Sequence, residues 1–171
     1  MRNIKYIFVH CSAGPQTQTV ESIKAYWKNN LGWKSPGYHY IIKANGEIVP
    51  LQPEEKASNG VAGYNSVSIN VCYIGGVDKN GKPVDNRTEY QKESLLYILK
   101  DLKKRYPNAV IMGHRDIWGS NPANWKKSCP CFDAKTEYAH IGEPEPTITP
   151  LLEEPKKESF FKRILNKFFK K

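Results

Sequence analysis

The sequence contains no long hydrophobic run. No stretch of its 171 residues approaches the roughly 20 apolar residues that a membrane-spanning helix needs. The first residues, Met1 to Lys5, also lack the apolar segment and small-residue cleavage site of a secretory signal peptide. We therefore expect a chain that is synthesised in the cytoplasm without a signal peptide.

Cysteine is also scarce. The chain has only Cys11, Cys72, Cys129 and Cys131, which do not form the disulfide framework of a small secreted protein. A bridge between Cys129 and Cys131 would close a very tight, strained ring. We expect free thiols, with Cys11 and Cys72 serving as small buried apolar residues.

Acidic residues are outnumbered by basic ones, and the formal net charge is +9. This charge predicts attraction to an anionic partner, such as nucleic acid, a membrane surface or an acidic wall polymer. Because no nucleic-acid-binding motif is present, we expect no nucleic-acid partner. We expect a monomer.

The composition changes near residue 142, which divides the chain into three predicted parts. Residues 1–142 have the composition of one folded domain. Residues 143–158 form a predicted linker, because Glu143 to Pro155 holds four prolines and four glutamates. Residues 159–171 form a predicted basic amphipathic helical tail.

In this tail, helical spacing separates apolar from polar side chains. The apolar half contains Phe160, Phe161, Ile164, Leu165, Phe168 and Phe169, and the basic residues opposite include Lys162, Arg163 and Lys167. Such a helix suits the headgroup region of an anionic membrane. The alternative is a terminal helix that docks on the folded domain.

The first 142 residues alternate strand and helix patterns. A short apolar run over Ile4 to Val9 predicts a buried strand, and Val20, Ile23 and Trp27 have helical spacing before Gly32. Further strands are expected within 38–49, as a hairpin with a two-residue Asn-Gly turn, at 67–73 and at 109–112. A capping box at 88–91 begins a second long helix, which ends before Pro107. This order predicts an α/β fold, with a single mixed central sheet and helices packed against it.

Three possible metal ligands stand out by their positions. His10 ends the first strand, His114 ends the last one, and Cys129 follows fifteen residues later in a loop. Two imidazoles and a thiolate suit zinc and leave a fourth position for water, as a catalytic site requires. Copper could use the same donors, but no short loop gathers Cys, His and Met as copper sites usually do.

Five motifs in order resemble one family. They are FVHCSA (8–13), GYHYII (37–42), GYNSVSINVCYIGG (63–76), GHRD (113–116) and KSCPCFD (127–133). Together they resemble the zinc-dependent N-acetylmuramoyl-L-alanine amidases, which include amidase-type phage lysozymes and peptidoglycan recognition proteins. The resemblance covers about residues 4–140 and implies a mixed α/β amidase fold.

The resemblance implies one zinc ion per chain, bound by His10, His114 and Cys129. Tyr38 and Lys127 match the family positions that assist the chemistry, and both can stabilise an oxyanion. The general acid stays open among Tyr38, Lys127 and the zinc-bound water. Because Cys131 stands where many members have a non-thiol residue, either thiol could be the ligand, and the Lys-x-Cys-Pro alignment favours Cys129.

Other residues could contact substrate. Trp118, Asn121 and Trp125 lie in a long loop that could line the groove, and Asn65 could contact the peptide. Ordinary loop packing or a turn explains each of them equally simply. Tyr38 and His39 should point to opposite faces of a strand, which makes His39 a structural histidine.

The resemblance implies hydrolysis of the amide bond between N-acetylmuramic acid and L-alanine in peptidoglycan, by a phage or prophage endolysin. Such an enzyme would act on the cell wall after release or non-classical export. The alternatives are a peptidoglycan-binding module without activity and an intracellular regulatory protein on the same fold.

Overall fold

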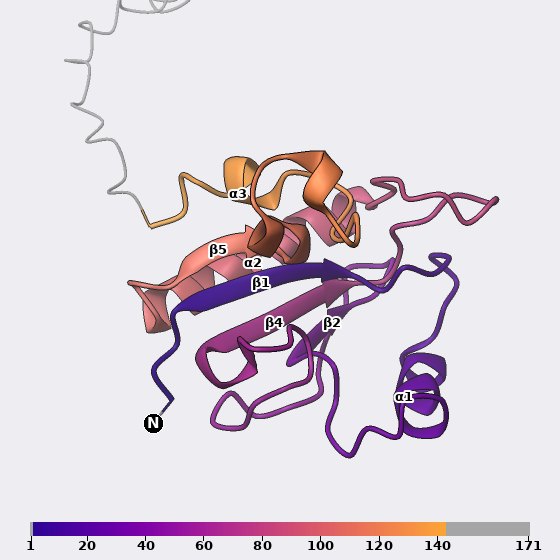
Figure 1. Ribbon diagram of the computed structural model, residues 1–171, viewed down its shortest axis with the longest axis horizontal. Helices are drawn as coiled ribbons and strands as arrows, with labels where there is room; N and C mark the ends of the chain where they lie inside the picture. The colour runs from indigo at the N-terminus through magenta and orange to yellow at the C-terminus, as the bar shows by residue number, and fades with distance from the viewer. Residues whose placement is uncertain (1, 143–171) are drawn as a thin grey trace, which may run out of the picture.

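The computed structural model describes residues 2–142, which contain one five-stranded sheet with strand order β3-β2-β4-β1-β5 (Figure 1). The strands are β1 (Tyr6–Cys11), β2 (Tyr40–Ile42), β3 (Ile48–Pro50), β4 (Ser68–Tyr73) and β5 (Val110–Gly113). β1 pairs in parallel with β4 and β5, β2 pairs in parallel with β4, and β3 is antiparallel to β2. The predicted mixed sheet and order of elements are confirmed.

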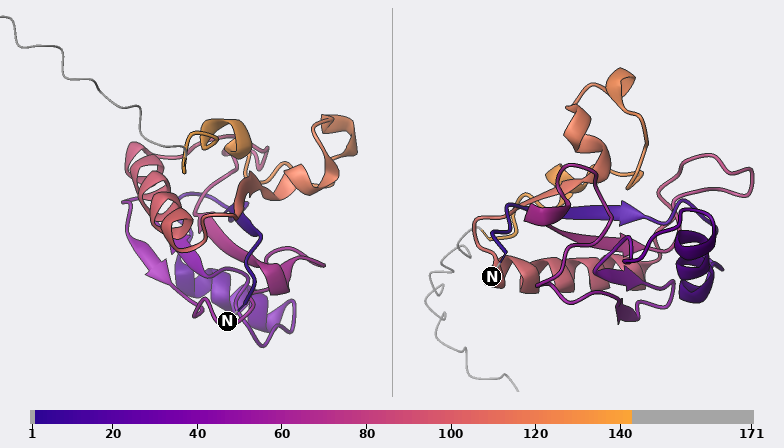
Figure 2. Two further views of the ribbon diagram at one scale, coloured as in Figure 1. Left: turned by 90° about the vertical axis from the view of Figure 1, so that its left-hand side faces the viewer. Right: turned by 60° about the horizontal axis from the view of Figure 1, so that its bottom comes forward.

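Two long helices cover opposite faces of the sheet. Helix α2 (Glu89–Arg105) runs along one face (Figure 2). It begins with the predicted capping box, in which Thr88 Oγ1 accepts from the Gln91 N–H while Gln91 Oε1 accepts from the Thr88 N–H. Helix α1 (Val20–Asn29) packs its buried residues against Ile41, Cys72 and Ile74 in a separate apolar cluster. One face of the sheet is therefore covered by α2 and the other by α1, each with its own apolar cluster.

Strand alternation decides which side chains face which layer. In β1, Ile7, Val9 and Cys11 belong to the apolar core that includes the buried residues of α2. The residues between them, Phe8 and His10, therefore point to the other face. His10 thus lies on the side of the sheet that α1 covers.

The strand boundaries and one turn differ from the prediction. β1 lies two residues later than the expected run, so it continues one residue past His10, to Cys11. The hairpin turn also has three residues instead of two, because Lys43 N–H donates to Glu47 O across residues 44–46. Gly46 takes φ 86°, the left-handed geometry that this longer turn places on glycine.

Four short helices were not predicted, because each is too short to show a period. They are the 3₁₀ segments η1 (Asn65–Val67), η2 (His114–Trp118) and η3 (Pro122–Asn124), and the single α-turn α3 (Ala134–Glu137). No helix within residues 2–142 is long and apolar enough to cross a membrane. The predicted linker and amphipathic tail lie outside the described residues.

Candidate metal centre

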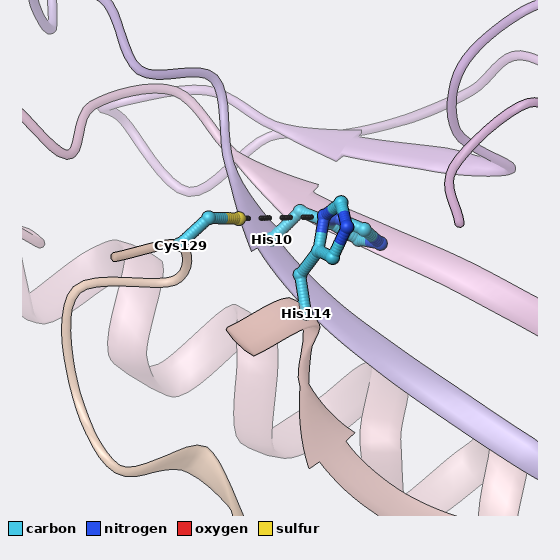
Figure 3. A group of neighbouring side chains, drawn as sticks. All are labelled: His10, His114 and Cys129. Atoms are coloured by element: carbon cyan, nitrogen blue, oxygen red, sulfur yellow. Dashed lines mark hydrogen bonds between the residues drawn. The ribbon is translucent and has the colours of Figure 1, made fainter. Parts of the chain in front are cut away.

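Three side chains from distant parts of the chain meet at one end of the sheet. His10, His114 and Cys129 each offer a donor atom, and these atoms all lie within 4.8 Å of one another. Figure 3 shows them converging from β1, from the start of η2 and from the loop beyond. The structure thus brings together the three residues that the sequence proposed as ligands.

His10 is held firmly within β1. Its side chain is almost fully buried, and its two ring nitrogens face different partners. Nδ1 lies 3.7 Å from Cys129 Sγ, whereas Nε2 lies 2.9 Å from Asn70 Oδ1. Burial lowers the pKa of His10 well below its ordinary value, and the neighbouring His114 adds to this effect.

His114 begins η2, directly after β5. Its ring stacks on Trp118 with centroids 5.5 Å apart. Burial, and then the positive charge of Lys127, lower the pKa of His114 to about 4. Both histidines are therefore neutral near pH 7, which is the form that binds metal.

The loop that carries Cys129 is anchored on both sides. Its carbonyl accepts from Arg115 N–H at 2.8 Å, and its Sγ accepts from Cys11 N–H at 3.3 Å. One residue further, the carbonyl of Pro130 accepts from the Tyr73 hydroxyl at 2.7 Å. These contacts tie the thiol to β1 and to the start of η2, which carry the two histidines.

The second thiol of the loop points elsewhere. Cys131 Sγ lies 3.2 Å from Gly76 O and 3.7 Å from Cys11 Sγ. Cys131 is absent from the group of donor atoms that includes both histidines. This geometry favours Cys129 as the ligand, as the sequence motif did.

The site opens into a groove of about 630 Å³. Tyr38 and Lys127 both line this groove together with His114 and Cys129. Tyr38 packs its ring 5.0 Å from that of His10, and burial raises the pKa of its phenol well above the ordinary value. The phenol therefore stays protonated near pH 7 and can donate a hydrogen bond.

The other residues proposed for substrate contact do not line the groove. Asn65 Oδ1 accepts from Val61 N–H, and Asn121 Oδ1 accepts from Ala123 N–H, so both amides stabilise turns. The Trp125 ring lies 4.1 Å from the Arg115 guanidinium. Trp118 is the nearest of these residues to the site, through its stacking on His114.

Sequence reasoning missed most of the groove wall. Further lining residues include Gln18, Trp27, Trp33, Asn59 and Gly60. Trp27 was expected only as the apolar face of a helix, but its ring also packs edge-on against Tyr38 at 5.3 Å. Aromatic residues flanking the GYHYII motif were the one available signal.

The donor set fits zinc. Two ligands bound at ordinary Zn–S and Zn–N lengths in a tetrahedron lie about 3.6 Å apart. The distance of 3.7 Å between Cys129 Sγ and His10 Nδ1 agrees with that value. His114 and Cys129 also line the groove, so an ion held by the three residues would be accessible from it.

Comparisons with known proteins agree with this picture. A family model described as N-acetylmuramoyl-L-alanine amidase matches residues 1–132. The endolysin of Klebsiella phage KP32 is 39% identical over 131 residues, which are 75% of this chain and 82% of the relative. The endolysin of Enterobacteria phage K11 is 38% identical over 138 residues, which are 80% of this chain and 85% of the relative.

Among solved structures, the Ph2119 endolysin from the Thermus scotoductus MAT2119 bacteriophage Ph2119 is similar. It has a TM-score of 0.65 and 26% identity, covering 83% of this chain and 86% of that chain. The similarity in sequence and the similarity in fold therefore both extend over nearly all the described residues.

Proposed function

The chain belongs to the N-acetylmuramoyl-L-alanine amidase family, and we propose that it uses one zinc ion to cleave its peptidoglycan substrate. The ion is held by His10, His114 and Cys129, and the bond cleaved joins N-acetylmuramic acid to L-alanine. The observation that carries this proposal is the convergence of three zinc donors at a groove that Tyr38 and Lys127 also line. As in the phage endolysins that it resembles, the chain acts on the cell wall.

Each residue of the site has a distinct task in this proposal. A zinc ion held by His10, His114 and Cys129 would supply a nucleophile at neutral pH, since zinc lowers the pKa of water to about 7. Lys127 places an ammonium beside the groove, where it stabilises the oxyanion of the tetrahedral intermediate. The protonated phenol of Tyr38 donates a hydrogen bond to the same oxyanion. Either group can also protonate the leaving amine.

A peptidoglycan-binding module without activity is the main alternative. Such a module needs the groove but has no use for a cysteine sulfur placed next to two imidazoles. Cys129 is present and lies within the donor group, which favours catalysis. No sequence feature identifies a partner surface for the intracellular regulatory alternative.

The proposed function is tested with metal-free protein on purified sacculi. Activity should return as zinc is added, reach its maximum at one ion per chain, and not return with magnesium, which prefers oxygen ligands. The products should carry new L-alanine amino termini and no new reducing sugar ends. Full activity in the metal-free protein, or release of reducing ends alone, would contradict the proposal.

The predicted tail supports a second, separable proposal, that the chain binds an anionic membrane surface through residues 159–171. Full-length protein should sediment with vesicles containing anionic lipid, whereas a version ending at Gly142 should not. The two versions should hydrolyse purified sacculi equally fast, because that substrate has no membrane. Equal vesicle binding by both versions would assign the tail another role.

A further inference from the structure

Asn70 contacts the metal centre from behind. It lies in β4, beside β1, and its side chain is fully buried. Its Oδ1 is 2.9 Å from Nε2 of His10, the ring nitrogen that points away from Cys129. A buried amide must satisfy its hydrogen bonds within the protein, so the partners of Asn70 determine its orientation.

A chain of hydrogen bonds gives the amide its direction. The backbone N–H of Asn70 donates to His39 Nδ1 at 3.0 Å, so this nitrogen carries no proton. The Ser58 hydroxyl oxygen lies 3.0 Å from the same nitrogen. The NH₂ group of Asn70 donates to Ser58 Oγ at 2.9 Å and faces Ser68 Oγ at 3.4 Å. On its other side, the His39 ring uses Nε2–H to donate to Lys56 O at 3.0 Å.

This direction determines the tautomer of His10. With its NH₂ group turned to Ser58, Asn70 presents its carbonyl oxygen to His10. A carbonyl oxygen only accepts, so His10 must carry its proton on Nε2. The lone pair is then on Nδ1, which lies 3.7 Å from Cys129 Sγ.

We propose that Asn70 is a positioning residue that holds His10 in the tautomer that binds metal through Nδ1. The inference extends the zinc proposal above to a residue that does not touch the metal. A hydrogen bond from a ligating histidine to an outer partner fixes the ring, and loss of such a partner typically weakens metal binding about 10- to 100-fold. Asn70 is such an outer partner, because its Oδ1 accepts a hydrogen bond from Nε2 of His10.

The groove wall leaves room for this amide. Gly60 lines the groove, and a Cβ at this position would lie 2.3 Å from Asn70 Cγ. Any larger residue would therefore displace the amide from its place between Ser58 and His10. The Asn70 side chain can therefore occupy its place beside His10 only because residue 60 is a glycine.

The test measures zinc affinity and tautomer, without relying on activity. We expect Asn70→Ala to bind zinc about 10- to 100-fold more weakly in competition with a chelator. In the metal-free variant, ¹⁵N chemical shifts should show His10 as a mixture of tautomers instead of the Nε2–H form. Asn70→Asp keeps an acceptor facing His10 and should restore the single tautomer. Gly60→Ala removes no donor or acceptor and should still weaken zinc binding.

Ile69→Val is the matched control for simple destabilisation. Ile69 is the neighbour of Asn70 in β4 but packs in the core shared with α2. This variant should lower the melting temperature and leave zinc affinity unchanged. The inference is overturned if Asn70→Ala binds zinc as tightly as this control, or if His10 keeps its Nε2–H form without Asn70. Failure of the wild type to bind zinc would instead remove the zinc proposal, while the tautomer measurement would still decide the role of Asn70.

Discussion

Replacing Cys129 with alanine is expected to lower amidase activity at least about 1000-fold. Metal-ion stabilisation of a transition state is worth several kcal/mol, and each 1.4 kcal/mol corresponds to a factor of ten in rate. The variant retains His10 and His114, but two neutral imidazoles alone form an incomplete zinc site. Bound zinc and turnover on sacculi should therefore fall together, which elemental analysis of the dialysed protein can follow.

Cys131→Ala is the control for this experiment. Its thiol lies in the same loop, two residues away, but faces Gly76 O and Cys11 Sγ. Removing it should leave the zinc content at one per chain and change activity only slightly. Loss of zinc in the Cys131 variant with retention in the Cys129 variant would reverse the assignment of the ligand.

The sequence indicates where the two proposed histidine ligands lie because each of them is attached to a strand. His10 lies on a strand recognisable from its apolar run, and His114 follows another. Parallel strands end at the same edge of a sheet, so their terminal residues meet in any fold that makes β1 and β5 neighbours. The family motif then adds the loop that contains Cys129.

The groove wall could not be predicted in the same way. Trp33, Asn59 and Gly60 lie in loops, whose paths depend on contacts between segments distant in sequence. Asn59 Nδ2, for example, donates to Ser35 O, which joins two loops more than twenty residues apart. Turn residues of this kind show no period from which their position could be inferred.

Asn70 was overlooked for a different reason. Strand alternation over residues 67–73 correctly separates Ile69 and Val71 from Asn70. Such alternation ordinarily indicates a polar face exposed to water. Here both faces of β4 are buried, and Asn70 is fully covered. The sequence therefore predicted which face of the strand Asn70 lies on. It did not predict that this face is buried, which is why the Asn70 amide must find its partners within the protein.

Replacing Lys127 with alanine is expected to lower kcat about 100- to 1000-fold while the protein keeps its zinc. Removal of a single oxyanion donor typically has this effect. The ammonium acts on charge that develops only in the transition state, so KM should change little. The side chain lines the groove but supplies no donor to the metal group. Steady-state kinetics on a soluble muropeptide, with zinc analysis of the same sample, would measure both quantities.

Lys126→Ala separates this role from a general effect of charge. Lys126 is the exposed neighbour of Lys127 and does not line the groove. Attraction between a basic surface and an anionic wall should weaken similarly in both variants, and this change should shrink at high salt. The loss specific to Lys127 should persist at high salt, because it arises beside the reacting bond. The prediction is contradicted if the two variants lose activity equally, or if Lys127→Ala raises only KM. In either case Lys127 would serve to attract the wall polymer, and Tyr38 would be the protein's donor to the oxyanion.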